Sequence, residues 1–188
     1  MPEHRLKSLT PLGHDKPKTT THGPITITEI VDVALASLAI RRDQAKAFTM
    51  AATAIGIPLP EPGHYKANST YRAFWLGPEQ WMVEAPFASH EDIVAVLRPA
   101  FGATASITEQ TDAWVRFDVV GSDLPTMFER LCAFDLRRHG SGSSTRTMIE
   151  HLGCYIVIHS DEKFSVIGPR SSAHSIDHAL LTAAKSAF

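Results

Sequence analysis

The sequence predicts an α+β fold built from two halves, about 25–110 and 111–188, over mostly antiparallel sheet. Strand-length apolar runs and amphipathic helical stretches occur in the same order in each half: strand, helix, strand, strand, helix. Short turns such as Gly77-Pro78-Glu79 and Asp161-Glu162-Lys163 separate neighbouring strands, which is typical of hairpins. With 188 residues, 44% of them hydrophobic and 20% charged, the chain is typical of a globular protein with a substantial core.

The first half is expected to follow an N-terminal arm. Residues 1–24 contain several prolines and no apolar periodicity, so they predict a mobile arm, or a strap laid on a partner. The β-branched stretch from Ile25 to Ile40 predicts one or two strands. Asp43 is expected to cap a helix that ends near Ile55, and residues 57–70 are expected to form a loop.

A hairpin and a helix are predicted for the rest of the first half. Tyr71–Leu76 and Gln80–Glu84 have the length and spacing of paired strands. Ser89 and Asp92 resemble a capping box, with Asp in place of the usual Glu. They precede an amphipathic helix whose apolar stripe is formed by Ile93, Val96, Leu97 and Ala100.

The second half begins with an alternating strand over 114–120, in which Val115, Phe117 and Val119 are expected to face the core. A helix with Pro125 in its first turn follows. After a connector at 137–145, strands are predicted at 147–152, 155–159 and 164–167. The final helix is expected to span 172–187.

Charge and hydropathy exclude several classes of partner. The net charge of −2 argues against nucleic acid, whose binding normally requires a basic surface. No apolar run approaches the roughly 20 residues that span a bilayer. Met1–Thr21 lacks the apolar segment of a secretory signal, which indicates a cytoplasmic protein. Cys132 and Cys154 are therefore expected to be reduced, packed thiols.

The sequence predicts no catalytic, cofactor-binding or metal-binding residue. His174 and His178 have helical i, i+4 spacing, but they project to the solvent face and have no third ligand nearby. The Gly/Ser-rich run at 139–144 lacks the phosphate-loop patterns, so we interpret it as a flexible connector.

Five residues are candidates for a surface that contacts a partner protein. They are Tyr71, Trp75, Trp81, Arg146 and Arg170. Interfaces are enriched in Trp and Tyr, and arginine suits a partner's carboxylate or phosphate. Because Phe74 and Trp75 are adjacent in a strand, their side chains must point to opposite faces. The alternative, that all three tryptophans belong to the core, stays open.

Three blocks of the sequence carry a resemblance to a known family. They are Leu59-Pro60 with 74–82 (FWLGPEQWM), then 110–115 with Gly121 and 132–136 (CAFDL), and finally 169–173 (PRSSA). Together they resemble the gamma subunits of heterotetrameric sarcosine oxidases, and the W-L-G-P block is the most specific part. Thr111 and Ser172 depart from the family pattern.

The resemblance implies a fold like the folate-binding domain of aminomethyltransferases and a non-catalytic role beside alpha, beta and delta subunits. In such a complex sarcosine is oxidised to glycine. FAD, FMN, NAD, tetrahydrofolate and zinc are then expected on the partner subunits and none in this chain, and the isolated chain is expected to self-associate. The alternatives are a gamma-like subunit of another N-methyl amino-acid oxidising complex such as N-methylglutamate dehydrogenase, a stand-alone folate-binding protein, or a homo-oligomeric protein unrelated to flavoenzymes.

Overall fold

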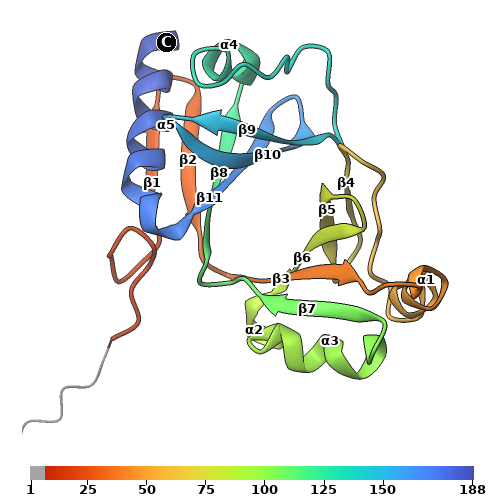
Figure 1. Ribbon diagram of the computed structural model, residues 1–188. Coiled ribbons are helices and arrows are strands. Elements are labelled where there is room, and N and C mark those ends of the chain that lie inside the picture. The colour runs from red at the N-terminus through yellow and green to blue at the C-terminus, as the bar shows by residue number, and fades with distance from the viewer. Residues whose placement is uncertain (1–6) are drawn as a thin grey trace, which may run out of the picture.

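Two antiparallel sheets face each other in the computed structural model, which describes residues 7–188, and the helices pack on the outer faces of the sheets (Figure 1). The six-stranded sheet has the order β1-β2-β8-β11-β10-β9. Its strands are β1 (Thr19–His22), β2 (Ile25–Ile30), β8 (Trp114–Gly121), β9 (Ser144–Ile149), β10 (Leu152–Ser160) and β11 (Lys163–Pro169).

The five-stranded sheet has the order β4-β5-β6-β3-β7. Its strands are β3 (Val33–Ile40), β4 (Tyr65–Ala67), β5 (Arg72–Gly77), β6 (Gln80–Pro86) and β7 (Ala105–Glu109). The helices are α1 (Ala45–Ala54), α2 (Phe87–His90), α3 (Ile93–Phe101), α4 (Leu124–Phe128) and α5 (Ala173–Ala187), with a 3₁₀ turn η1 (Arg170–Ser172) before α5.

The two sheets are built to the same plan. Strands β4, β5, β6 and β3 lie in the same spatial order as β9, β10, β11 and β8, and α1 and α3 occupy the places in sequence that α4 and α5 occupy in the second half. The fifth position is filled by β7 in one sheet and by β2 in the other. The predicted boundary at residue 25 is therefore wrong, because β2 pairs with β8 and belongs to the second half.

Three apolar clusters fill the layers. One lies between the six-stranded sheet and α4 and α5, and a second lies between the five-stranded sheet and α1 and α3. The third, the inter-sheet cluster, consists of Leu35, Phe74, Met82, Tyr155, Val157 and Ile167. Because side chains alternate along each strand, every central strand contributes to a helix-facing cluster and to the space between the sheets. The predicted α+β class is confirmed. The order of elements repeats, but each half has three strands between its helices, where the predicted order had two.

The N-terminal segment differs from the predicted arm. Residues 1–6 lie outside the described residues, but the strap, residues 7–18, packs against the second half and leads into β1, which pairs with β2. Leu12 is buried. The buried carboxylate of Glu29 accepts hydrogen bonds from the backbone N–H groups of Leu12 (2.9 Å) and Lys18 (3.1 Å). The prediction of a mobile arm is therefore wrong for residues 7–24. The Glu29 carboxylate supplies hydrogen-bond acceptors for amides of this segment and holds it against the second half.

Several local predictions also need correction. Asp43 does not cap α1: it has a positive φ of 62°, and the N-cap is Gln44, which makes no side-chain capping bond. Ser89 lies within α2, whereas Asp92 caps α3 by accepting from the N–H of Ala95. The loop predicted at 57–70 contains β4, which is too short to give a periodic signal. Strand β7 was not predicted, although it closes one edge of the five-stranded sheet.

Candidate functional site

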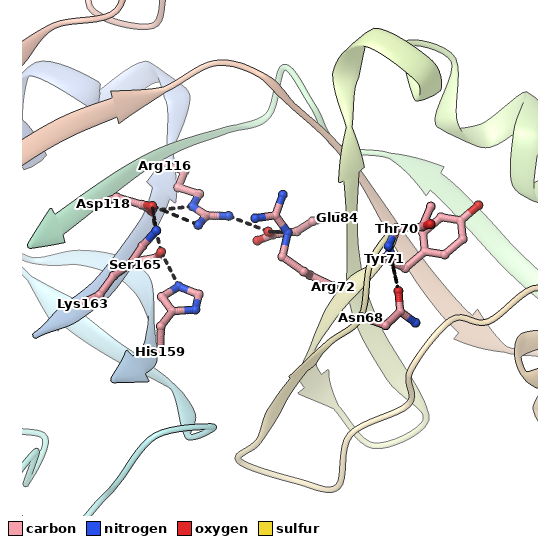
Figure 2. A network of polar contacts seen from close by, with 10 residues as sticks. All are labelled: Asn68, Thr70, Tyr71, Arg72, Glu84, Arg116, Asp118, His159, Lys163 and Ser165. Atoms are coloured by element: carbon pink, nitrogen blue, oxygen red, sulfur yellow. Dashed lines mark hydrogen bonds and ion pairs between the residues drawn. The ribbon is translucent and has the colours of Figure 1, made fainter. Parts of the chain in front are cut away.

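A group of charged and polar side chains, four of them buried, lies between the two sheets beside the inter-sheet cluster (Figure 2). This polar centre consists of Arg72, Glu84, Arg116, Asp118, His159, Lys163 and Ser165. Strand β8 turns Val115, Phe117 and Val119 toward the helices, so its alternate residues Arg116 and Asp118 project between the sheets. The alternation predicted over 114–120 leaves these two residues on the face away from the core, yet both are buried.

Arg116 connects the two sheets. Its Nη1 donates to Glu84 Oε2 of β6 at 2.6 Å, across the space between them. Its Nε and Nη2 donate to Asp118 Oδ1 and Oδ2 of its own strand at 2.7 and 3.3 Å. The side chains of Arg116 and Glu84 are only 4% and 2% exposed, so this ion pair is excluded from water. Such a pair is costly to break, because either charge left alone would be buried without compensation.

Neighbouring side chains complete the network. Arg72 Nε lies 3.5 Å from Glu84 Oε2, and Lys163 Nζ lies 2.9 Å from Asp118 Oδ2. Ser165 Oγ donates to Asp118 Oδ1 at 2.6 Å. Since the hydroxyl proton of Ser165 is used in that bond, Ser165 Oγ accepts from His159 Nε2 at 2.7 Å, which fixes the tautomer of the ring.

The electrostatics keep Asp118 ionised and His159 neutral. Burial alone would raise the pKa of Asp118, but the Arg116 guanidinium and the donors from Arg116, Ser165 and Lys163 hold that pKa well below its usual range. Burial alone would lower the pKa of Arg116, and Glu84 and Asp118 raise it above its usual range. Burial, reinforced by Arg116, lowers the pKa of His159 to about 4. His159 is therefore uncharged at neutral pH.

The chemistry open to this centre is limited. Within residues 7–188, every buried side-chain nitrogen and oxygen has a hydrogen-bond partner. A carboxylate with a strongly lowered pKa and several donors is a weak proton acceptor at neutral pH. The polar centre therefore joins the two halves, and its paired atoms resemble a structural network more than an acid–base site.

A cavity of about 350 Å³ opens beside Arg116 at one end of the space between the sheets. This strap cavity is bounded by residues 8–11 of the strap and by Leu35, Phe87 and Trp114. Arg170 and Asp112 lie at its rim, where Arg170 Nη1 is 3.7 Å from Asp112 Oδ1 and Arg170 Nη2 donates to the carbonyl of Leu9 at 3.1 Å. The cavity thus combines apolar walls with one buried and one partly exposed arginine.

The structure separates the five predicted interface residues. Tyr71 is 8% exposed and packs in the cluster under α1 and α3, where its hydroxyl lies 3.1 Å from His90 Nε2. Trp81 stacks on Phe48 and donates to the carbonyl of Pro60, so it supports the same core. Trp75 is half-buried on β5, the strand that pairs with β6, and it lies on the opposite face of the sheet from Phe74, as predicted. Whether any of them meets a partner stays a prediction.

The two predicted arginines also lie apart. Arg146 is exposed on β9, an edge strand of the six-stranded sheet, whereas Arg170 belongs to the strap cavity.

His174 and His178 are exposed on α5, as the helical projection predicted. Among residues 7–188, no group of three or more His, Cys, Asp or Glu side chains is arranged to hold a metal ion. None of the helices in this part of the chain is long and apolar enough to cross a membrane.

Burial raises the pKa of both cysteine thiols, to about 11 in the case of Cys154. Cys154 of β10 is buried in the cluster beneath α5. The packing there is tight, because a side chain at Gly168 would collide with both Ile176 and Cys154. These thiols are packed and protonated at neutral pH, which agrees with the prediction that they are free and structural.

Comparisons with known proteins identify the fold. A chain of the heterotetrameric sarcosine oxidase from Corynebacterium sp. U-96 superimposes with a TM-score of 0.74 at 18% identity, covering 86% of this chain and 84% of that one. This chain shares its fold with that sarcosine oxidase chain. The aminomethyltransferase T of the Bartonella henselae glycine cleavage system matches with a TM-score of 0.61 at 12% identity, over 81% of this chain and 44% of that enzyme. No protein-family model and no curated protein matches the sequence.

Proposed function

We propose that this chain is the non-catalytic gamma subunit of a heterotetrameric sarcosine oxidase. In this role it supports the oxidative demethylation of sarcosine to glycine by flavin- and folate-binding partner chains. The observation that carries the proposal is the likeness in fold to a chain of sarcosine oxidase over 86% of this chain and 84% of that one. The W-L-G-P block in the β5–β6 hairpin adds an independent resemblance in sequence.

The polar centre supports a role without chemistry of its own. Its charged groups are used to hold one sheet against the other, and the inter-sheet cluster occupies the space beside them. In the proposed complex, FAD, FMN, NAD, tetrahydrofolate and zinc belong to the alpha, beta and delta subunits. This chain would contribute a rigid surface to them.

The outward face of α1 is suited to contact with a partner. It presents Ala45, Lys46, Thr49, Met50, Thr53 and Ala54 around a shallow hollow, and Met50 is 65% exposed. The hydroxyls of Thr49 and Thr53 donate to carbonyl oxygens one turn earlier in the helix, each at 2.9 Å. The face is therefore less polar than its composition implies, as expected for the core of a protein interface.

Co-expression with the neighbouring flavoprotein genes tests the proposal. One particle that contains this chain in fixed proportion and produces hydrogen peroxide from sarcosine is the expected result. Purification of this chain alone should give no bound flavin or folate, and self-association is expected because an interface is exposed. Sarcosine turnover by the isolated chain, or an active complex that never includes it, would contradict the proposal.

Surface variants can locate the contact within the same experiment. Met50→Glu places a charge on the face of α1, and Arg146→Glu reverses the charge on β9. Arg138→Glu is the matched control for the second change, because Arg138 is 83% exposed in the connector after α4. We expect at least one of the first two variants to lose incorporation into the complex, while all three keep the melting temperature of the isolated chain.

Stand-alone folate binding is a second candidate, favoured by the fold shared with an aminomethyltransferase. Calorimetric titration of the isolated chain with tetrahydrofolate separates the two functions. Saturable one-to-one binding without partners would favour this candidate, and the absence of heat would favour the subunit. If the complex assembles but oxidises another N-methyl amino acid, such as N-methylglutamate, the gamma-like subunit of a dehydrogenase is the better description.

A further inference from the structure

The strap cavity has the size and lining of a small-molecule site. Its volume of about 350 Å³ lies at the lower end of the roughly 300–1,000 Å³ that is usual for ligand pockets. Leu35, Phe87 and Trp114 provide apolar walls, and the indole N–H of Trp114 is already bound to Gln110 Oε1 at 3.0 Å. A molecule that enters would therefore contact apolar surface on these sides.

Arg116 lines the cavity and has N–H groups that its protein partners do not use. Of the five N–H groups of a guanidinium, three donate to Glu84 and Asp118. One N–H on Nη1 and one on Nη2 have no protein acceptor among residues 7–188. Two adjacent nitrogens with available donors match the two oxygens of a carboxylate.

The charge around the cavity also favours an anion. In the polar centre the cations Arg72, Arg116 and Lys163 face only two carboxylates, those of Glu84 and Asp118. His159 adds no charge at neutral pH. Each cation contacts a carboxylate, but three cations share two carboxylates, so the centre has a net charge of +1 that a bound anion would balance.

Arg170 at the rim is a second cation that a ligand could contact, and Asp112 competes with a ligand for it. Arg170 lies 3.7 Å from Asp112, which is beyond the range of a good hydrogen bond, and the Asp112 side chain is 87% exposed. Asp15, which also lines the cavity, is held by Lys7 at 2.7 Å. Arg170 can thus exchange its loose contact with Asp112 for a ligand oxygen.

We propose that the strap cavity binds a small monocarboxylate with an apolar body of about one ring, its carboxylate held by Arg116 and Arg170 and its body against Trp114 and Phe87. The strap forms the outer wall, so residues 8–11 cover the bound molecule. This site is separate from the proposed subunit role, and neither proposal depends on the other.

Phenylacetate is a suitable probe, with phenylacetamide as its uncharged isostere. Calorimetry on the full-length chain measures the affinity, and the indole N–H resonance of Trp114, assigned with Trp114→Phe, reports on the location. We expect saturable binding of phenylacetate at millimolar concentration, a shift of that resonance, and weaker binding of phenylacetamide by about tenfold or more, because hydrogen bonds to a charged group are lost.

Three variants make the test specific. Arg170→Gln should weaken phenylacetate binding by about tenfold. Asp112→Asn should tighten it, because the competing carboxylate is removed, and a merely destabilised protein would not produce this gain. Arg146→Gln, the same change on exposed β9, should leave the affinity unchanged. Absence of saturable binding, equal affinity for phenylacetamide, an unmoved Trp114 resonance, or equal effects of Arg170→Gln and Arg146→Gln would each overturn the proposal.

Discussion

Replacing Arg116 by methionine tests the polar centre most directly. The substitution keeps an unbranched side chain in the space between the sheets but leaves Glu84 and Asp118 buried without their shared cation. Removing one partner of a buried ion pair costs about 3–5 kcal/mol. Lys163 remains 2.9 Å from Asp118, and Arg72 remains 3.5 Å from Glu84, so the lower end of this range applies. For a chain of this size, about 3 kcal/mol corresponds to a fall in melting temperature of roughly 6–12 °C.

The pH dependence gives the prediction a sign. In the parent protein the pKa of Asp118 is lowered, so the stabilisation it contributes is present above about pH 4 and is lost as the pH falls below that. Without Arg116, burial shifts the pKa of Asp118 upward relative to the parent. Protonation then relieves the uncompensated charge, and the stability difference between Arg116→Met and the parent should shrink as the pH falls from 8 to 5.

Urea unfolding at several pH values, followed by circular dichroism, measures both effects. The exposed Arg138 is the matched control, and Arg138→Met should change the free energy of unfolding by less than about 0.5 kcal/mol. Combining Arg116→Met with Glu84→Gln and Asp118→Asn should recover most of the loss, because no buried charge is left unpaired. A loss below about 1 kcal/mol that is the same at every pH would refute the assigned role of the ion pairs.

Three further changes test other parts of the structure. Phe74→Ala, which removes a fully buried ring from the inter-sheet cluster, should cost about 3–5 kcal/mol in urea unfolding, and a cost below 1 kcal/mol would contradict the packing. Glu29→Gln should speed hydrogen exchange of the Leu12 and Lys18 amides well before global unfolding, and unchanged protection would show that another contact holds the strap. The unfolded state binds a proton to His159 more readily than the folded state does, so the free energy of unfolding should fall as the pH drops from about 6.5 toward 4. His159→Gln should remove that slope. An NMR titration midpoint near 6.5 for the folded ring would contradict this expectation.

The regular elements could be predicted because their apolar residues repeat with a clear period. Helix α5 and strand β8 lie within about two residues of their expected bounds, since each presents one buried face along its length. The failures occur where periodicity is absent or short. Strand β4 has three residues, and β1 has only threonine and histidine, so their pairing with longer neighbours decides their structure.

The polar centre could not be predicted from the same pattern. Alternation in β8 distinguishes two faces, and a charged face is normally assigned to solvent. Here a second sheet covers that face, and Glu84, which pairs with Arg116, lies 32 positions earlier in the chain. The available signal was weak: charged residues stand among apolar ones in two strands of opposite halves. Without the arrangement of the sheets, nothing in the sequence pairs those strands.

The two halves meet through this network and the inter-sheet cluster, and that arrangement bears on where the protein can act. The halves are also joined by backbone hydrogen bonds at the starts of the equivalent strands β4 and β9. Tyr65 N–H donates to the Gly142 carbonyl at 2.7 Å, and Ser144 N–H donates to the Gly63 carbonyl at 2.8 Å. Opening the sheets would break both links together with a buried ion pair, which is energetically unfavourable. A ligand or partner must therefore approach from the strap cavity, the edge strands or the outer helical faces. A rigid body with its recognition surfaces at the periphery fits the subunit role that we propose.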